Sequence, residues 1–132
     1  MQFPQITAGY AGLLGLIYVI LSMLVVRQRV RTRVHHGDGG DDRLNRLIRA
    51  HANFAEYVPL ILLLAALLEA GGWPHMHWVL GPLLAARISH PIGMLTPVAS
   101  PQQYALRGGA IVVTWAVLIF LARTLLVIHW PF

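Results

Sequence analysis

Cysteine and lysine are absent from this chain of 132 residues, and charged residues make up only 11% of it. Without cysteine the chain has no disulfide, no thiolate metal site and no thiol nucleophile of its own. Soluble domains carry about 25% charged residues, so this composition excludes most soluble proteins. The hydrophobic share of 57%, without low-complexity tracts, also excludes a disordered chain.

Arginine supplies all the side-chain positive charge other than that of histidine. Ten arginines against five acidic residues give a formal net charge of +5. Such an excess can indicate nucleic-acid binding, but these arginines lie beside or inside apolar runs, as in membrane proteins. We therefore expect membrane lipid, and no nucleic acid, among the partners of this chain.

Four long apolar runs predict four membrane spans, at about residues 6–27, 43–70, 77–96 and 103–129. The first is uncharged from Ile6 to Val26, which is about the 20 residues needed to cross a hydrocarbon core. It follows no basic segment and has no clear cleavage motif, so we expect a retained span rather than a signal peptide. The connections are too short for another domain. The sequence thus predicts one all-α domain, residues 1–132, folded as an integral membrane four-helix bundle.

The charges of the connections predict the orientation of the bundle. The first connection is rich in arginine, whereas the second, from Ala70 to His77, has none. By the positive-inside rule, the first connection faces the cytoplasm and both termini lie on the outer side. An aromatic belt is expected at the outer interface, and this orientation brings there Trp73, Trp78 and Trp130. Asp41 or Asp42 is expected to cap the second helix.

Polar side chains inside the spans are the main candidates for function, because a charged residue at the centre of a span costs roughly 2.5–3.5 kcal/mol. In the second span, four polar residues fall within a sector of about 80° and Tyr57 widens it to about 100°. These four are Arg46, Arg49, Asn53 and Glu56. Arg87 and His90 share a face of the third span, and Arg107 lies in the first turns of the fourth. Their similar predicted depth, near the cytoplasmic boundary, predicts one polar pocket.

An anionic ligand is the simplest complement of this arginine-rich pocket, because a guanidinium binds a carboxylate through two parallel hydrogen bonds. Glu56 can pair with Arg46 or Arg49, or it can accept the ammonium group of a ligand. A ligand with several carboxylates and one amine, such as glutathione, fits this set. A cationic pocket also lowers the pKa of a thiol. Here the thiol has to come from the ligand, because the chain has no cysteine.

Structural roles are open for the same residues. Arg46 can lie in the headgroup zone, and Arg49, Asn53 and Glu56 can form an intramembrane network that holds no ligand. Arg87 serves equally well as an ion-pair partner of Glu56 or as a ligand contact.

Several other polar residues have simpler explanations. A histidine such as His90 is more often a hydrogen-bonded packing residue than a catalyst. The arginines between residues 27 and 33 set the topology and also meet anionic lipid. The histidines at residues 35–36 and 75–77 lack ligand spacing on a defined element, so we expect no metal site.

The stretch from Arg46 to Pro59 resembles the signature of the MAPEG family, the membrane-associated proteins in eicosanoid and glutathione metabolism. It reads R-x-x-R-A-H-x-N-x-x-E, followed by an aromatic residue and a proline, and a four-span chain of this length matches throughout. The resemblance implies a homotrimer of four-helix subunits that binds glutathione between neighbouring subunits near the cytoplasmic face. The many arginines and the absence of lysine suggest a bacterial member, in the inner membrane.

The resemblance also implies roles for single residues. Arg49, Asn53, Glu56 and Tyr57 would hold glutathione, with Glu56 at its amine and the arginine at its carboxylates. Arg107 matches the arginine thought to stabilise the thiolate in the enzymes of the family, so it is the expected catalytic residue.

Further contacts follow from the same resemblance. Arg27 is the best match for an arginine that joins the site from the end of the first helix, although Arg29 or Arg31 can take its place. Arg87 and His90 match positions where the family has an arginine and a polar or aromatic ligand contact. The expected glutathione contacts are therefore Arg27, Arg46, Arg49, Asn53, Glu56, Tyr57, Arg87 and His90.

Two departures from the family pattern bear on the reaction. Met94 stands where several members have a tyrosine, and Gly108 where some have a serine. Losing these hydroxyls weakens the case for any one eicosanoid reaction and leaves room for a member that binds without catalysing.

Two functions are consistent with this sequence. The first is a glutathione transferase, with peroxidase activity as a side reaction, that takes apolar electrophiles from the bilayer. The second is a non-catalytic protein of the same fold that binds lipid or serves as a scaffold. A small transporter is disfavoured, because inverted repeats and broken helices are lacking.

Overall fold

Helices form all the regular structure in the computed structural model, which describes residues 2–130 of the chain. They are α1 (Gln5–Thr32), α2 (Asp42–Ala70), α3 (Met76–Leu95), α4 (Pro101–Gln103), η1 (Tyr104–Gly108) and α5 (Gly109–His129). The last three follow one another without a break, so they make one long helix with a π-helical turn near its start. The predicted all-α architecture of four long helices is confirmed.

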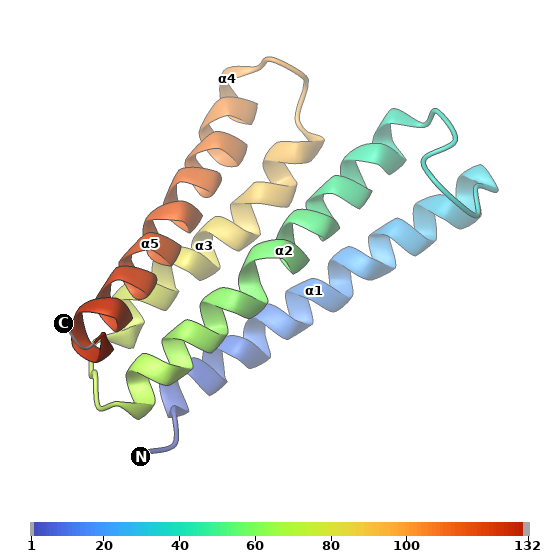
Figure 1. Ribbon diagram of the computed structural model, residues 1–132. Coiled ribbons are helices and arrows are strands. Elements are labelled where there is room, and N and C mark those ends of the chain that lie inside the picture. The colour runs from blue at the N-terminus through green and yellow to red at the C-terminus, as the bar shows by residue number, and fades with distance from the viewer. Residues whose placement is uncertain (1, 131–132) are drawn as a thin grey trace.

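The four long helices run up and down beside one another, as Figure 1 shows. α2 and α3 each pack against the other three long helices, whereas α1 and α5 do not touch within the described residues. The chain enters and leaves at the same end of the bundle, beside the short α2–α3 turn (Figure 1). The α1–α2 connection, with its arginines, and α4 lie at the opposite end.

Three of these helices are long and apolar enough to cross a membrane: α1, α2 and the continuous helix Pro101–His129. α3 does not meet this criterion, although the sequence analysis treated all four runs as spans. The difference arises because α3 carries Arg87 and His90, together with two prolines inside the helix, Pro82 and Pro91. Both polar side chains are buried by the other helices, with exposed fractions of 1% and 4%.

α1 attaches to the bundle along a narrow strip. Its buried residues are spaced seven apart, at Thr7, Leu14, Leu21 and Gln28. Seven residues make close to two helical turns, so these four positions fall on one line along the helix. Most other apolar residues of α1 point outward, including Leu16 and Met23 with exposed fractions of 65% and 64%. α1 therefore offers most of its surface to lipid or to another subunit.

The arginine-rich end of α1 remains helical. The predicted span ends near residue 27, but the helix continues to Thr32 and ends at Arg33 in the left-handed conformation. Arg27, Arg29 and Arg31 therefore lie on the helix and not in a loop. After the connection, the carboxylate of Asp41 accepts a hydrogen bond from the Leu44 N–H and caps α2, which confirms one of the two predicted caps.

Glu69, near the end of α2, caps the start of α1. Its carboxylate accepts hydrogen bonds from the backbone N–H groups of Ile6 and Thr7, both 2.8 Å, and from the Thr7 hydroxyl at 2.6 Å. Pro4, the residue that precedes α1, provides no side-chain cap. A residue 62 or 63 positions away thus satisfies N–H groups that the helix itself leaves free. The same contact joins the start of α1 to the end of α2.

Arg87 joins α3 to two neighbouring helices. Its guanidinium donates to the Asn53 side-chain oxygen on α2, at 3.0 Å, and to the Thr114 hydroxyl on α5. Thr114 in turn donates to the Ala110 carbonyl at 2.7 Å. A buried charge needs such partners, because desolvation without hydrogen bonds is costly. Three helices are therefore held together at this level of the bundle.

We predict that Glu69→Ala lowers the free energy of unfolding by about 1–2 kcal/mol, because the first turn of α1 loses its cap. Thermal unfolding of the purified protein in detergent measures the effect. Glu56→Ala is the matched control, since Glu56 is an exposed carboxylate of the same helix without an ion-pair partner within residues 2–130. Equal melting temperatures for Glu69→Ala and the control would show that this contact contributes nothing.

We predict that Arg87→Met lowers the free energy of unfolding by roughly 2–4 kcal/mol, because the Asn53 oxygen loses its donor and three helices lose their link. Thermal unfolding in detergent without ligand is the measurement, and Arg123→Met, an exposed arginine of α5, is the control. A stable Arg87→Met variant that has lost only ligand affinity would contradict the structural role.

Candidate functional site

The polar face of α2 is divided between buried and exposed side chains. Asn53 and Tyr57 are half-buried, whereas Arg49 and Glu56 are exposed. Asn53 accepts the bond from Arg87, and the Tyr57 hydroxyl accepts one from the Trp115 indole N–H at 3.3 Å. These four residues form a polar patch on α2. Its inner edge, Asn53 and Tyr57, is hydrogen-bonded to Arg87 on α3 and to Trp115 on α5.

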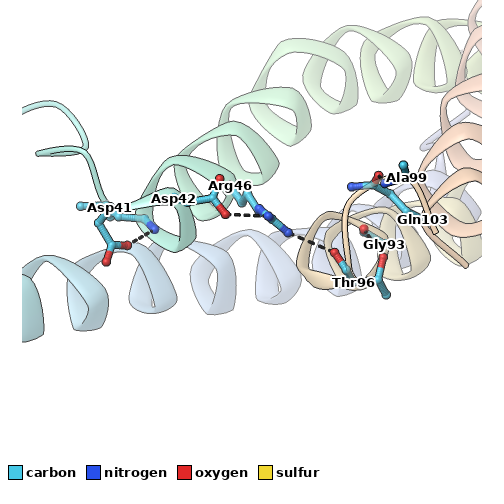
Figure 2. Close-up of polar contacts among 8 residues, drawn as sticks. Asp41, Asp42, Arg46, Gly93, Thr96, Ala99 and Gln103 are labelled. Atoms are coloured by element: carbon cyan, nitrogen blue, oxygen red, sulfur yellow. Dashed lines mark hydrogen bonds and ion pairs between the residues drawn. The ribbon is translucent and has the colours of Figure 1, made fainter.

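Arg46 is bound within the chain. Figure 2 shows its guanidinium between the Asp42 carboxylate, at 2.6 Å, and the Thr96 carbonyl, at 3.0 Å. Thr96 itself donates its hydroxyl to the Gly93 carbonyl at the end of α3. Arg46 therefore ties the start of α2 to the segment between α3 and α4. A glutathione contact by Arg46 stays a prediction, and the residue has this structural role as well.

The sequence left two roles open for Arg87, and the structure gives a third. Within residues 2–130, Arg46–Asp42 is the only ion pair, so Arg87 and Glu56 are not paired. Arg87 instead bonds Asn53 and Thr114, while its Nε–H is buried and meets no acceptor in the described chain. Buried donors rarely remain unpaired. This N–H is thus a free hydrogen-bond donor at the inner edge of the patch.

A close contact between α3 and η1 positions Arg107. A side chain at Gly93 would place its Cβ 2.6 Å from the Arg107 backbone nitrogen, so only glycine fits. Gly93 lies on the same face as His90, one turn further along α3, and both are buried. The Arg107 side chain is exposed, on the π-helical turn. Such turns occur often at functional sites, and nothing in the local sequence predicted this one.

The first-helix arginines differ in their freedom to bind a ligand. Arg29 donates from Nη1 to the carbonyls of Val34, His35 and Gly37, at 3.5, 3.2 and 2.9 Å. Arg27 and Arg31 are exposed and make no side-chain hydrogen bond to the rest of the described chain. The Arg29 guanidinium is therefore held at the end of α1, whereas those of Arg27 and Arg31 are free to turn toward a ligand of the α2 face.

The structure brings some predicted residues together and leaves others apart. Asn53 and Arg87 are in contact, and the Arg107 backbone packs against Gly93, one turn after His90 on α3. Arg49, Glu56, Arg107 and Arg27 are exposed on a single chain, without ion pairs among residues 2–130.

Thr114, Trp115 and Gly93 also belong to this region and were not predicted from the sequence. An isolated hydroxyl inside the apolar run of the fourth span was the available signal for Thr114. No three His, Asp or Glu side chains within the described part of the chain are grouped as metal ligands.

Comparisons with known proteins agree with the motif. The sequence profile of the MAPEG family matches residues 7–127. The inner membrane protein YecN of Escherichia coli K12 is 38% identical over 93 residues, which cover 67% of this chain and 70% of YecN. YecN from an Escherichia coli O6:H1 strain matches equally well. No solved structure matches the chain.

These relationships and the three apolar helices confirm the predicted location, an integral protein of a bacterial inner membrane. The match to the family profile extends over nearly the whole chain, including the polar residues of α2, α3 and η1. The chain therefore belongs to the MAPEG family.

Proposed function

We propose that this protein is a glutathione-dependent membrane transferase, with peroxidase activity as a side reaction, that works as a homotrimer. One observation carries the proposal. The motif that resembles the glutathione-binding signature of the family presents Arg49 and Glu56 outward from α2, next to the bonded pair Asn53 and Arg87. Family membership makes glutathione the ligand of choice for this patch.

The exposure of these charges supports a site shared between subunits. Arg49 and Glu56 lie on a helix that is apolar and long enough to cross a membrane, and a charge facing lipid at its centre would cost roughly 2.5–3.5 kcal/mol. A neighbouring subunit and a bound ligand would remove both side chains from lipid. The narrow attachment of α1, which leaves most of its apolar surface free, supports the same assembly.

The chemistry of the site follows from its charges. Arg49 and another arginine would bind the two carboxylates of glutathione, and Glu56 would accept its ammonium group. Arg107, held against Gly93 but free at its guanidinium, would stabilise the thiolate. The sulfur then attacks an apolar electrophile from the bilayer, and the leaving group departs with the electron pair of the broken bond. Electrostatic stabilisation of this kind is strong where water is excluded.

The orientation of the bundle is part of the proposal. The connection between α1 and α2, with the arginines at the end of α1, would face the cytoplasm, and both termini would lie outside. The candidate site, from Arg46 to Arg107, would then open near the cytoplasmic side, where glutathione keeps thiols reduced.

We predict that Arg107→Ala raises the pKa of the thiol of bound glutathione, because the thiolate loses a positive charge beside it. The rate of conjugation of glutathione to an aryl halide should fall by about 10²–10³-fold. The ultraviolet absorbance of the thiolate in the purified protein reports the first effect, and a turnover assay reports the second. Arg123→Ala is the matched control, because it removes an exposed arginine from the other end of the same helix. Unchanged thiolate and turnover in Arg107→Ala would contradict this role.

A second function, non-catalytic lipid binding, has an observation in its favour. An apolar crevice of about 280 Å³ lies on α1 and α2, lined by residues that include Leu14, Tyr18 and Phe54. Met94 and Gly108 also lack the hydroxyls of several family members.

Capture on immobilised glutathione distinguishes the two functions, and we predict that the detergent-solubilised protein is retained and is eluted by free glutathione. The basis is the charge complementarity of Arg49 and Glu56 with the peptide. Glu56→Gln should weaken retention, whereas Asp38→Asn, in the α1–α2 connection, should not. Failure to bind, together with a co-purifying fatty acid in mass spectrometry, would favour the lipid-binding function.

A further inference from the structure

A crevice at the arginine-rich end of α1 has no part in the proposed glutathione site. It has a volume of about 400 Å³ and is lined by Val26, Arg29, Val30, Arg33, Val34 and His35. Val26 and Val30 lie one turn apart and are 57% and 75% exposed. The crevice thus has an apolar wall along the helix and cationic or polar groups where the helix ends.

The positive charges of this crevice have no counter-ion within residues 2–130. The Arg33 side chain makes no hydrogen bond or ion pair with the rest of residues 2–130. Arg29 uses only its Nη1 for the carbonyls of residues 34, 35 and 37, which fixes the guanidinium and leaves Nη2 and Nε to donate elsewhere. The crevice therefore holds two guanidinium groups with free donors.

The acidic residues in the same connection and at the start of α2 are bound elsewhere. Asp41 caps α2 and Asp42 pairs with Arg46. Asp38 accepts hydrogen bonds from the Asn45 amide and the Gly40 N–H. These two bonds lower the pKa of the Asp38 carboxyl. None of the three carboxylates serves as a counter-ion for Arg29 or Arg33 in this part of the structure.

The backbone at Arg33 gives an independent reason to assign a role to its side chain. Arg33 has a φ of 56° at the end of α1, a conformation that glycine adopts without strain and that L side chains rarely adopt. An arginine at this position does not stabilise the end of the helix, so helix stability does not explain the residue type. We therefore look for the role of Arg33 in the contacts that its side chain can make. The left-handed turn also folds the chain back over Arg29, which brings the two guanidinium groups to the same crevice.

We propose that this crevice binds the headgroup of an anionic phospholipid. The phosphate would accept hydrogen bonds from Arg33 and Arg29, His35 would donate to the headgroup, and the first carbons of an acyl chain would lie against Val26 and Val30. A free phosphate ion would leave the apolar wall exposed, and a zwitterionic lipid would bring a second positive charge to two arginines. An anionic phospholipid matches both the cationic end and the apolar wall of the crevice. Anionic lipids are also abundant at membrane surfaces.

The experiment is lipid retention by the full-length protein. The protein is placed in nanodiscs that contain equal amounts of phosphatidylglycerol and phosphatidylcholine and is then extracted in a mild detergent. Native mass spectrometry measures which lipid remains bound to it and in what proportion. Arg33→Asn is the test variant, because asparagine tolerates the left-handed conformation and so keeps the end of α1 intact. Arg33→Lys retains the charge. Arg43→Asn removes an exposed arginine at the same end, outside the crevice.

The wild type, Arg33→Lys and Arg43→Asn are expected to retain phosphatidylglycerol in preference to phosphatidylcholine. Arg33→Asn should retain about fivefold less phosphatidylglycerol, the loss expected for one arginine near a membrane surface. Its melting temperature in detergent should stay within the range of the Arg43→Asn control, because the Arg33 side chain makes no hydrogen bond or ion pair with the other residues from 2 to 130.

Three results would overturn the proposal. Equal losses for Arg33→Asn and Arg43→Asn would mean that the lipid responds to overall charge and not to this crevice. Equal retention of the two lipids by the wild type would exclude recognition of an anionic headgroup. Displacement of phosphatidylglycerol by millimolar inorganic phosphate would assign the crevice to a small anion. The result does not depend on glutathione binding, so either proposal can fail alone.

Discussion

A guanidinium in the interior of a helical bundle needs hydrogen-bond acceptors around it, and the rest of this structure depends on how Arg87 obtains them. Its partners, Asn53 and Thr114, belong to α2 and α5. Since both must point at α3, the rotation of each helix about its own axis is fixed at this level. Arg49 and Glu56 lie one turn before and one turn after Asn53 on α2. Both lie about 40–60° to the same side of Asn53 around the helix axis, so the bond from Arg87 to Asn53 places them at the exposed edge of this polar face.

The sequence predicted those features of the fold that repeat along one helix or lie next to each other in the chain. The four helices, the polar face of α2 and the cap at Asp41 are of this kind, because length, spacing and local hydrogen bonding determine them. The bond from Arg87 to Thr114 on α5 could not be predicted in the same way. The hydroxyl of Thr114 stands out in the apolar first half of α5, but the local sequence does not tell which residue of another helix it meets. The cap that Glu69 gives to α1 joins residues more than 60 positions apart, and no local pattern reveals such a contact.

The sequence predicted which residues lie on the polar face of α2, but not which of them are bonded within the chain. Sequence spacing placed Arg49, Asn53 and Glu56 on one face, and the structure keeps them there. It also shows that Arg46 is bound to Asp42 and Thr96, which composition cannot tell. The position of Arg107 depends on Gly93, because the missing side chain lets η1 approach α3. A contact between two backbones leaves little trace in a hydrophobic pattern, so the π-helical turn was not predicted either.

The exclusive use of arginine can be understood from the three tasks that the guanidinium groups have in this chain. Arg29, Arg46 and Arg87 each donate to two or more oxygens within the chain, and a fork with five N–H donors satisfies several acceptors where an ammonium group would satisfy fewer. Arg49 and Arg107 remain free on the proposed ligand face, and Arg33 on the proposed lipid crevice. Because a guanidinium keeps its charge even when buried, the same residue type suits all three. Arg29 shows that the tasks are not exclusive: the bonds that order the end of α1 also hold its remaining donors toward the crevice.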